Sequence, residues 1–110
     1  MSARLPTGVV ASALLKRVND AGGLGVVRAK GDAQAGGILV ILEEPGGARR
    51  VVERGLGPDG ETALIETGPA DSTEVEDYWR RRRARDPDLW VIELDIAGGE
   101  RFAAETILGR

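Results

Sequence analysis

The chain has 110 residues, with 15 basic and 18 acidic side chains, a net charge of −3, and neither cysteine nor histidine. Without cysteine there is no disulfide framework and no thiolate-bound zinc centre, and without histidine there is no imidazole for a catalytic triad or for the commonest metal sites. We therefore expect neither a cofactor nor a metal ion.

The length is that of one ordinary domain, and we expect residues 1–110 to form a single one. No apolar stretch approaches the ~20 residues of a membrane span, so no membrane contact is predicted. The amino-terminal segment continues into a helical pattern without a cleavage site, unlike a signal peptide. Because the absence of cysteine also fits a reducing compartment, these features favour a cytoplasmic protein.

A first helix is predicted from Pro6 or Thr7 to about Ala21, where two glycines follow it. Four strands come next, separated by turns rich in glycine. The second strand consists of five large aliphatic residues and is expected to be central and buried on both faces. The four predicted strands cover residues 24–30, 38–42, 49–54 and 61–67.

A second helix is predicted after these strands. Residues 71–73 offer side chains that can cap it, and Thr73 and Glu76 have the spacing of a capping box. Pro87 ends the helix, because the residue before a proline avoids helical geometry. A fifth strand is expected over residues 89–96.

The resulting order is helix, four strands, helix, strand, which predicts an α+β domain. Because the turns are short, we expect a mainly antiparallel sheet of about five strands. Two main helices should cover one face of this sheet, and the other face would be exposed or would form a dimer. The pattern predicts no definite form for the tail, residues 101–110.

Three stretches of the sequence together have a familiar order and spacing: residues 10–18 (VASALLKRV), 30–36 (KGDAQAG) and 86–93 (DPDLWVIE). In these stretches, and over nearly the whole chain, the sequence resembles a small bacterial family of unknown function that is found mainly in alphaproteobacteria. Residues 104–110 depart from the family's pattern. The resemblance implies a bacterial cytoplasmic protein, and it implies no activity.

Two arginines lie on the apolar faces of the predicted helices, and both are candidate binding residues: Arg17 in the first helix and Arg82 in the second. A guanidinium on such a face extends to solvent, pairs with a carboxylate or binds an anion. We expect Arg82 to be held by a carboxylate, with Asp86, Glu66 and Glu93 as the alternatives.

The loop after the first strand is a second candidate site. Lys30 and Asp32 lie in this loop and Arg28 precedes it, so that it could bind an anion or a partner, although an ordinary hairpin loop is the alternative. Asp86 is a further candidate. It and Asp88 are two nearby carboxylates, and two carboxylates on either side of a proline are a poor basis for a metal site, which needs several oxygen ligands. We expect Trp90 to anchor the fifth strand in the core, with a ligand platform as the alternative.

Arginine occupies positions 80–83 and 85 of the second helix. Such a run could bind phosphate groups, or it could be a solvated helix end that offsets the helix dipole. Consecutive helical residues point about 100° apart, so these side chains cannot form one stripe. We favour the solvated helix end and do not expect nucleic acid as a partner.

The leading expectation is a non-catalytic protein-binding or adaptor domain, whose partner is another protein or a second copy of the chain. The alternative is a small anion-binding domain or enzyme that uses Arg17, Arg28, Asp32 and Arg82. A weaker alternative is a nucleic-acid binder that uses residues 80–85. A cleft that holds several of these charges would favour the anion-binding domain or enzyme, and a flat apolar patch would favour protein binding.

Overall fold

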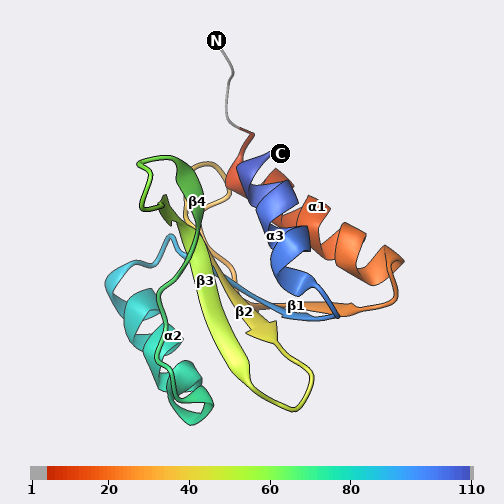
Figure 1. Cartoon of the computed structure of the whole chain (residues 1–110). Coiled ribbons are helices and arrows are strands. Elements are labelled where there is room, and N and C mark those ends of the chain that lie inside the picture. Colours follow the sequence, from red (N-terminus) through yellow and green to blue (C-terminus); the bar gives the residue numbers. More distant parts are fainter. Residues whose placement is uncertain (1–4, 110) are drawn as a thin grey trace.

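A computed structural model describes residues 5–109, and one five-stranded sheet with helices on both faces organises them (Figure 1). The elements, in chain order, are α1 (Thr7–Asp20), β1 (Leu24–Ala29), β2 (Ile38–Glu43), β3 (Arg49–Leu56), β4 (Thr62–Glu66), the short 3₁₀ helix η1 (Ser72–Glu74), α2 (Val75–Arg85), β5 (Trp90–Asp95) and α3 (Gly99–Leu108).

The strands lie side by side in the order β1-β5-β2-β3-β4. The pairs β2–β3 and β3–β4 are antiparallel, as predicted for consecutive strands. β1 and β5 are also antiparallel, but β2 and β5 are parallel. The sheet is therefore mixed, and the expected antiparallel meander exists only from β2 to β4. β5 lies between β1 and β2, so these two consecutive strands do not pair with each other.

β2 is the central strand and is buried on both faces, which confirms the prediction for residues 38–42. Leu39, Val40 and Ile41 are each 0% exposed. Val40 packs in a core cluster with Ile38 and Leu42 on one face of the sheet. Leu39 and Ile41 pack in a second cluster on the opposite face. The sheet thus has two apolar faces, and each must pack against other elements to be shielded from water.

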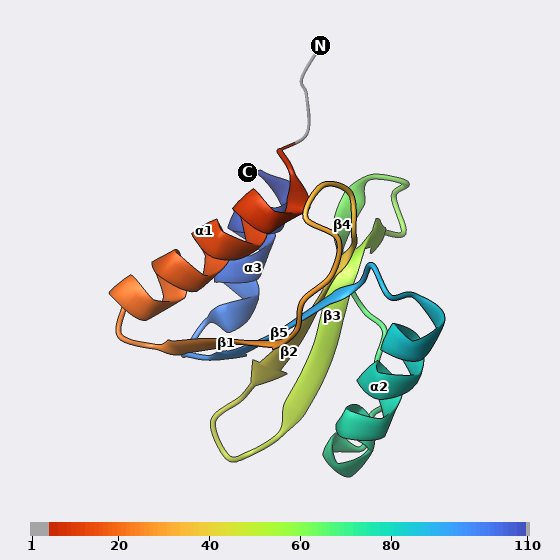
Figure 2. The same cartoon turned by 180° about the vertical axis from the view of Figure 1, so that it is seen from behind.

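Helices cover both faces of the sheet, where we expected them on one face only. α1 and α3 lie on one face, and their buried residues Leu14, Val18 and Ala103 join the first core cluster. α2 lies on the other face, where Val75 and Trp79 join the second cluster. Figures 1 and 2 show the sheet between these two layers. The second face is therefore occupied by the chain itself.

The tail, for which the pattern predicted no definite form, folds as the third helix, α3. Gly98 precedes this helix with a φ of 71° and provides no side-chain cap, so the usual start signal is missing from the sequence. Ala103 is nevertheless 0% exposed, because α3 packs beside α1. Within residues 5–109, no helix has both the length and the apolar character needed to cross a membrane.

The start of α2 differs from the predicted capping box. The Asp71 carboxylate accepts a hydrogen bond from the Thr73 amide at 2.9 Å, so Asp71 caps the η1 turn that leads into α2. Glu76 does not reach back to the cap, and instead pairs with arginines of the sheet. Glu76, which was expected to complete the capping box, thus attaches α2 to the strands.

Candidate functional site

The loop between β1 and β2 has a fixed shape that its own side chains maintain. The Asp32 carboxylate accepts hydrogen bonds from the amides of Gln34 at 3.1 Å and Ala35 at 2.8 Å. A carboxylate that caps two amides in this way closes a tight turn. Asp32, a predicted binding residue, therefore shapes the loop.

The loop is also attached to the start of β5. The Trp90 indole Nε1 donates to the Asp32 carbonyl oxygen at 2.8 Å, and the Trp90 amide donates to Gly37 O at 2.8 Å. The Asp32 amide donates to Asp88 O at 3.0 Å. A Cβ atom on Gly36 would overlap the Asp88 carbonyl oxygen. Trp90 is 6% exposed, which confirms that it is an anchor in the core.

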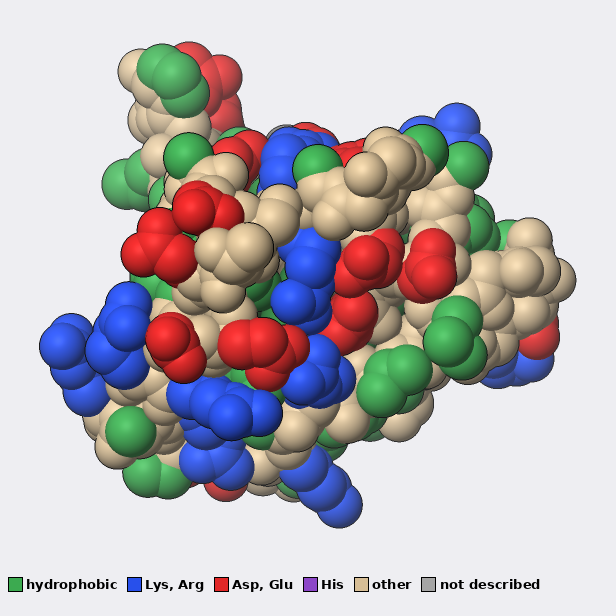
Figure 3. Space-filling model, turned by 90° about the horizontal axis from the view of Figure 1, so that it is seen from below, with side chains coloured by type: hydrophobic (Ala, Val, Ile, Leu, Met, Phe, Trp, Pro, Cys, Tyr) green, Lys and Arg blue, Asp and Glu red, His purple; other side chains and the backbone are tan. Residues whose placement is uncertain are grey.

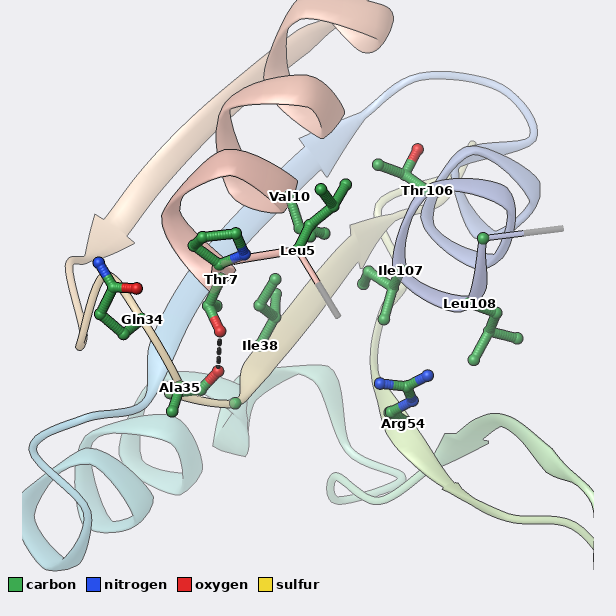
Figure 4. Close-up of a pocket in the computed structure, with 14 residues that line it drawn as sticks. Leu5, Thr7, Val10, Gln34, Ala35, Ile38, Arg54, Thr106, Ile107 and Leu108 are labelled. Atoms are coloured by element: carbon green, nitrogen blue, oxygen red, sulfur yellow. Dashed lines mark hydrogen bonds between the residues drawn. The ribbon is translucent and has the colours of Figure 1, made fainter. Parts of the chain in front are cut away.

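The first turn of α1 lies on the other side of the loop. The amides of Thr7 and Gly8 donate to the carbonyl oxygens of Gln34 at 3.2 Å and Ala33 at 2.8 Å. The Thr7 hydroxyl donates to Gly36 O at 2.7 Å, the contact drawn as a dashed line in Figure 4. These amides are among those that lack a partner within the helix, so the loop caps α1. The loop is thereby fixed between α1 and β5.

A groove of about 680 Å³ lies beside this loop, between the start of α1 and the end of α3 (Figure 4). This volume is within the range of ligand pockets, about 300–1,000 Å³. The lining residues come from α1 and the segment before it, the loop, β2, β3 and α3: Leu5, Pro6, Thr7, Val10, residues 34–38, Arg54 and residues 106–109.

The groove is mainly apolar and contains one cationic group. Val10, Ile38 and Ile107 belong to the core cluster or pack against it, and they give the groove its apolar wall. Among the described residues, those that line the groove include one charged side chain, Arg54, and no Asp or Glu. Leu5, also in the lining, is 65% exposed. The groove thus combines apolar surface, backbone groups and one guanidinium.

Arg17 supports the groove from outside it. Its guanidinium donates to Glu105 at 2.6 Å and to the Thr106 hydroxyl at 2.7 Å, and it lies 5.6 Å from the centre of the Phe102 ring. The hydrogen bond from Arg17 lowers the pKa of Glu105. These contacts tie α1 to α3, the two helices whose ends form the groove.

Arg28 belongs to an ion-pair network on the opposite side of the sheet. Its guanidinium lies 2.7 Å from a Glu93 oxygen, donates to Glu76 at 3.0 Å, and stacks 5.3 Å from the centre of the Trp79 ring. Figure 3 shows basic and acidic side chains side by side on the face seen from below. The network fastens α2 to the strands.

Arg49 completes this network among three carboxylates. Its nitrogens lie 2.9 Å from Glu43, 3.2 Å from Glu76 and 3.3 Å from Glu93. The contact to Glu43 is an ion pair without a well-aligned hydrogen bond, because the Nε–H does not point at the oxygen. Burial, and then a hydrogen bond shared with Glu93, raise the pKa of Glu43. Burial opposes ionisation of Glu76 too, but hydrogen bonds from Arg28 and Arg49 outweigh it and lower its pKa.

Arg82 is held by a carboxylate, as expected, but the partner is Glu53 of β3. Two guanidinium nitrogens donate to the two Glu53 oxygens at 2.7 and 2.8 Å, and one of them also donates to the Tyr78 hydroxyl at 2.7 Å. The expected partners Asp86, Glu66 and Glu93 were wrong. The hydrogen bonds from Arg82 lower the pKa of Glu53 despite its burial.

Lys30 and Asp86 contribute to local structure near the end of α2. The Lys30 carbonyl oxygen accepts a hydrogen bond from Arg83 at 2.7 Å, while the Lys30 side chain is exposed. The Asp86 carboxylate accepts one from the Asp88 amide at 3.1 Å. Within residues 5–109, no group of acidic side chains is arranged to hold a metal ion.

The seven predicted site residues do not form one site. Arg17 contacts α3, Arg28 and Arg82 lie on the α2 side of the sheet with different partners, and Asp32 with Trp90 holds the loop. None of the seven lines the groove. Arg54, which lines the groove, was not predicted, because no local signal in the sequence separates it from the other arginines of β3. The groove's second wall was also missed, because α3 was not predicted.

Comparison with known proteins identifies the family. A crystal structure of a DUF1491 family protein from Caulobacter crescentus CB15 is 30% identical, with a TM-score of 0.77 over 90% of this chain and 94% of that chain. An NMR structure of a DUF1491 family protein from the same organism is 29% identical, with a TM-score of 0.75 over 92% of this chain and 94% of that chain.

A solution structure of protein Atu0922 from A. tumefaciens is 27% identical, with a TM-score of 0.69 over 86% of this chain and 87% of that chain. Curated proteins gave no match to this chain. Residues 5–104 match the family described as "Protein of unknown function (DUF1491)", and the chain therefore belongs to that family.

Proposed function

We propose that the chain is a non-catalytic binding domain that holds a segment of another protein in the groove between α1, the loop and α3. The observation that carries this proposal is the composition of the groove. One wall is apolar, Arg54 is the one charged side chain among the described residues that line the groove, and the lining residue Leu5 is an exposed apolar side chain. Binding sites for other molecules commonly have this composition.

An exposed apolar side chain stands in the lining of the groove: Leu5 is 65% exposed. Leu56 is 71% exposed and follows Arg54, another lining residue, by two residues in β3, so it leaves the same face of the sheet. Exposed apolar surface of this kind favours a polypeptide, which extends beyond the pocket, over a small molecule that the groove would enclose.

The alternative of an anion-binding domain or enzyme has less support. It needs Arg17, Arg28, Asp32 and Arg82 in one cleft, and the groove contains none of the four. Each is engaged with carboxylates or amides of the chain itself. Opening the contacts of Arg28 and Arg82 for a substrate would leave partly buried charges without their partners.

A second copy of the chain is a poorer occupant than another protein. A two-fold dimer joins a surface patch to the same patch of the other copy, so that patch must be complementary to itself. A concave groove that faces an identical concave groove does not meet this condition. We propose further that the protein acts in the bacterial cytoplasm, because the absence of cysteine fits a reducing compartment.

The experiment is a selection of random peptides, displayed with either end free, against the full chain. Peptides that bind should shift the amide NMR signals of the groove residues, such as Thr7, Gly37 and Ile107. Leu5→Asp should weaken binding roughly tenfold, the cost of burying a charge on an apolar wall. Leu24→Asp is the matched control, because Leu24 is also an exposed leucine, at 58%, and lies in β1 away from the groove.

Three outcomes would overturn the proposal. The selection could enrich no peptide, the shifted signals could lie on the α2 side of the sheet, or Leu5→Asp and Leu24→Asp could weaken binding equally. Light scattering of the free protein serves as an additional test. A dimer that dissociates in Leu5→Asp would make a second copy the occupant of the groove.

A further inference from the structure

The strand β1 forms one edge of the sheet and carries exposed apolar side chains (Figure 2). Leu24, Val26 and Val27 are 58%, 40% and 37% exposed. They are three of the six large hydrophobic side chains that are exposed within residues 5–109, although β1 is only six residues long. In β4, the strand at the other edge, the aliphatic residues at positions 63–65 are half-buried. An exposed apolar edge such as β1 is a template for pairing with another strand.

The backbone of β1 offers hydrogen-bonding groups at two positions. The Gly25 amide donates to Asn19 Oδ1 at 3.1 Å, so it points away from β5. In an antiparallel pair the N–H and C=O groups of one residue point to the same side, and that side alternates along the strand. Gly25 and Val27 therefore present these groups to the outer side of β1. Beyond Val27 the register with β5 shifts, and the regular edge ends there.

Asn19 takes the position of an acceptor in an added strand. It lies in the last turn of α1, and its side chain is exposed. A carboxamide oxygen accepts the same hydrogen bond as a peptide carbonyl oxygen. An added strand can therefore replace Asn19 without leaving the Gly25 amide unsatisfied.

The shape of β1 fits a second copy of itself when the two strands run antiparallel about a two-fold axis at Val26. Such an axis places Val26 opposite Val26 of the second copy, and Gly25 opposite Val27. Successive side chains leave opposite faces of a sheet. On one face the two Val26 side chains pack together, and on the other each Val27 lies opposite a residue without a side chain. The two Gly25–Val27 pairs supply the hydrogen bonds between the strands.

Exposed charges at the two ends of β1 favour the same arrangement. Asp95 of β5 lies opposite Leu24 at the start of β1, and Lys30 follows its last residue. Both charged side chains are exposed. An antiparallel copy brings the Lys30 end of each chain toward the Asp95 end of the other, so that the attraction occurs twice. A parallel copy would bring ends of like charge together.

We infer that β1 is a dimer interface, at which a second copy of the chain adds its own β1 antiparallel and extends the sheet across both subunits. The interface is independent of the proposed binding of another protein, because no residue of β1 lines the groove. Pairing through one short edge buries a small area, so the dimer is reversible and its population rises with protein concentration.

The test is sedimentation velocity of the full chain over a range of concentrations. The wild type should change from monomer to dimer as its concentration rises. Val26→Lys places a charge at the centre of the interface, opposite the same charge of the second copy, and should raise the dimer Kd roughly tenfold or more.

Val9→Lys is the matched control. Val9 is also an exposed valine, at 51%, and it lies on the side of α1 opposite the buried Ala11 and Val18. This substitution should leave the dimer Kd unchanged. Thermal melts of each variant establish that it is folded.

An exchange of charges tests the antiparallel arrangement. Lys30→Glu and Asp95→Lys should each raise the dimer Kd by roughly fivefold, because each weakens two exposed contacts. The double variant should restore the wild-type Kd, since the two positions attract again with their signs reversed. Within one chain these positions belong to opposite ends of β1, so restoration requires the second copy. A double variant that dimerises no better than the single ones would overturn the inference.

Amide hydrogen exchange reports on the backbone pairing. Exchange of the Val27 amide should slow as the wild-type concentration rises, and it should not slow in Val26→Lys. A wild type that stays monomeric at roughly 1 mM would show that β1 does not pair with itself. A dimer that Val26→Lys leaves intact, or that Val9→Lys or Leu5→Asp dissociates as strongly, would place the interface on another surface. Either result overturns the inference and leaves the proposed function of the groove to its own test.

Discussion

The Arg82–Glu53 pair is the best-formed charged contact between α2 and the sheet, with two parallel hydrogen bonds at 2.7 and 2.8 Å. The two side chains are 32% and 18% exposed, so the pair lies between a surface ion pair and a buried one. We expect Arg82→Ala to lower the free energy of unfolding by roughly 2 kcal/mol, between the ~1 kcal/mol of exposed pairs and the 3–5 kcal/mol of buried ones.

Denaturant melts of Arg82→Ala and Arg81→Ala provide the comparison. Arg81 is exposed in the same helix, and its replacement should change stability by less than about 0.5 kcal/mol. Equal losses in the two variants would mean that the two-pronged pair does not form in solution.

Glu53 and Glu43 should respond to pH in opposite directions. The hydrogen bonds from Arg82 lower the pKa of Glu53, so its stabilising contribution is present above the unfolded pKa of about 4.3 and is lost as pH falls through the folded value. Burial raises the pKa of Glu43, so its contribution is present below about pH 4.3 and is lost as pH rises through the folded value.

Glutamine substitutions at Glu53 and Glu43 test the two opposite pH dependences of stability in one experiment. At pH 7, Glu53→Gln should lower the free energy of unfolding by roughly 1–3 kcal/mol, whereas Glu43→Gln should leave it unchanged or raise it. At pH 3.5, below the unfolded pKa of about 4.3, the loss caused by Glu53→Gln should shrink, because the unfolded carboxylate takes up a proton more readily than the native one, whose pKa Arg82 lowers. Urea melts at the two pH values provide the measurement, and a loss from Glu43→Gln as large as that from Glu53→Gln would contradict the prediction.

The loop between β1 and β2 depends on one of two adjacent glycines. A Cβ atom on Gly36 would overlap the backbone oxygen of Asp88, which cannot move without displacing the start of β5. On Gly37 the nearest atom would be Leu89 Cδ1 at 3.5 Å, an ordinary contact. Gly36→Ala should therefore destabilise the protein by roughly 3 kcal/mol or more, while Gly37→Ala should be neutral or stabilise it by about 0.4–1 kcal/mol.

Thermal melts of both glycine variants provide the measurement, with binding of a groove peptide as the second readout. Gly36→Ala should impair both stability and binding, because the loop forms one wall of the groove. If the two variants melted alike, the close packing of the loop against β5 would be wrong.

The elements themselves were largely predictable, because their signals are local. The aliphatic run at residues 38–42 and the glycines that separate the strands fix β2 and its neighbours. The insertion of β5 between β1 and β2 was not predictable in this way, because strand order depends on contacts between distant residues. α3 escaped prediction for another reason: Gly98 leaves its start without a side-chain cap.

At the scale of the whole molecule, none of the seven site residues predicted from the sequence lines the groove, although two of them lie close to it. Asp32 and Trp90 were candidates, and they hold the loop that forms one wall. Arg54 has no local signal that separates it from Arg49 and Arg50, because all three are arginines of the same strand and only the fold places one of them in the groove. The groove requires α1, β3 and α3 together, and only the fold brings these three elements to one place.

The distribution of charge over the whole molecule predicts that the protein does not bind duplex DNA through the arginine run of α2. Arg80 lies 3.4 Å from Glu76, Arg82 is held by Glu53, and Arg83 donates to the Lys30 carbonyl oxygen. The run is thus largely engaged with the protein, which carries a net charge of −3.

A surface that bound DNA through Z phosphates would lose affinity as salt rises, with a slope of log affinity against log salt concentration of about −0.9Z. We expect no binding of a labelled duplex near physiological salt and, at low salt, only weak binding with a slope of about −2 or shallower. Replacing Arg80, Arg81 and Arg83 by glutamine should change little, whereas tight, steeply salt-dependent binding that this triple substitution abolishes would establish the helix end as a nucleic-acid site.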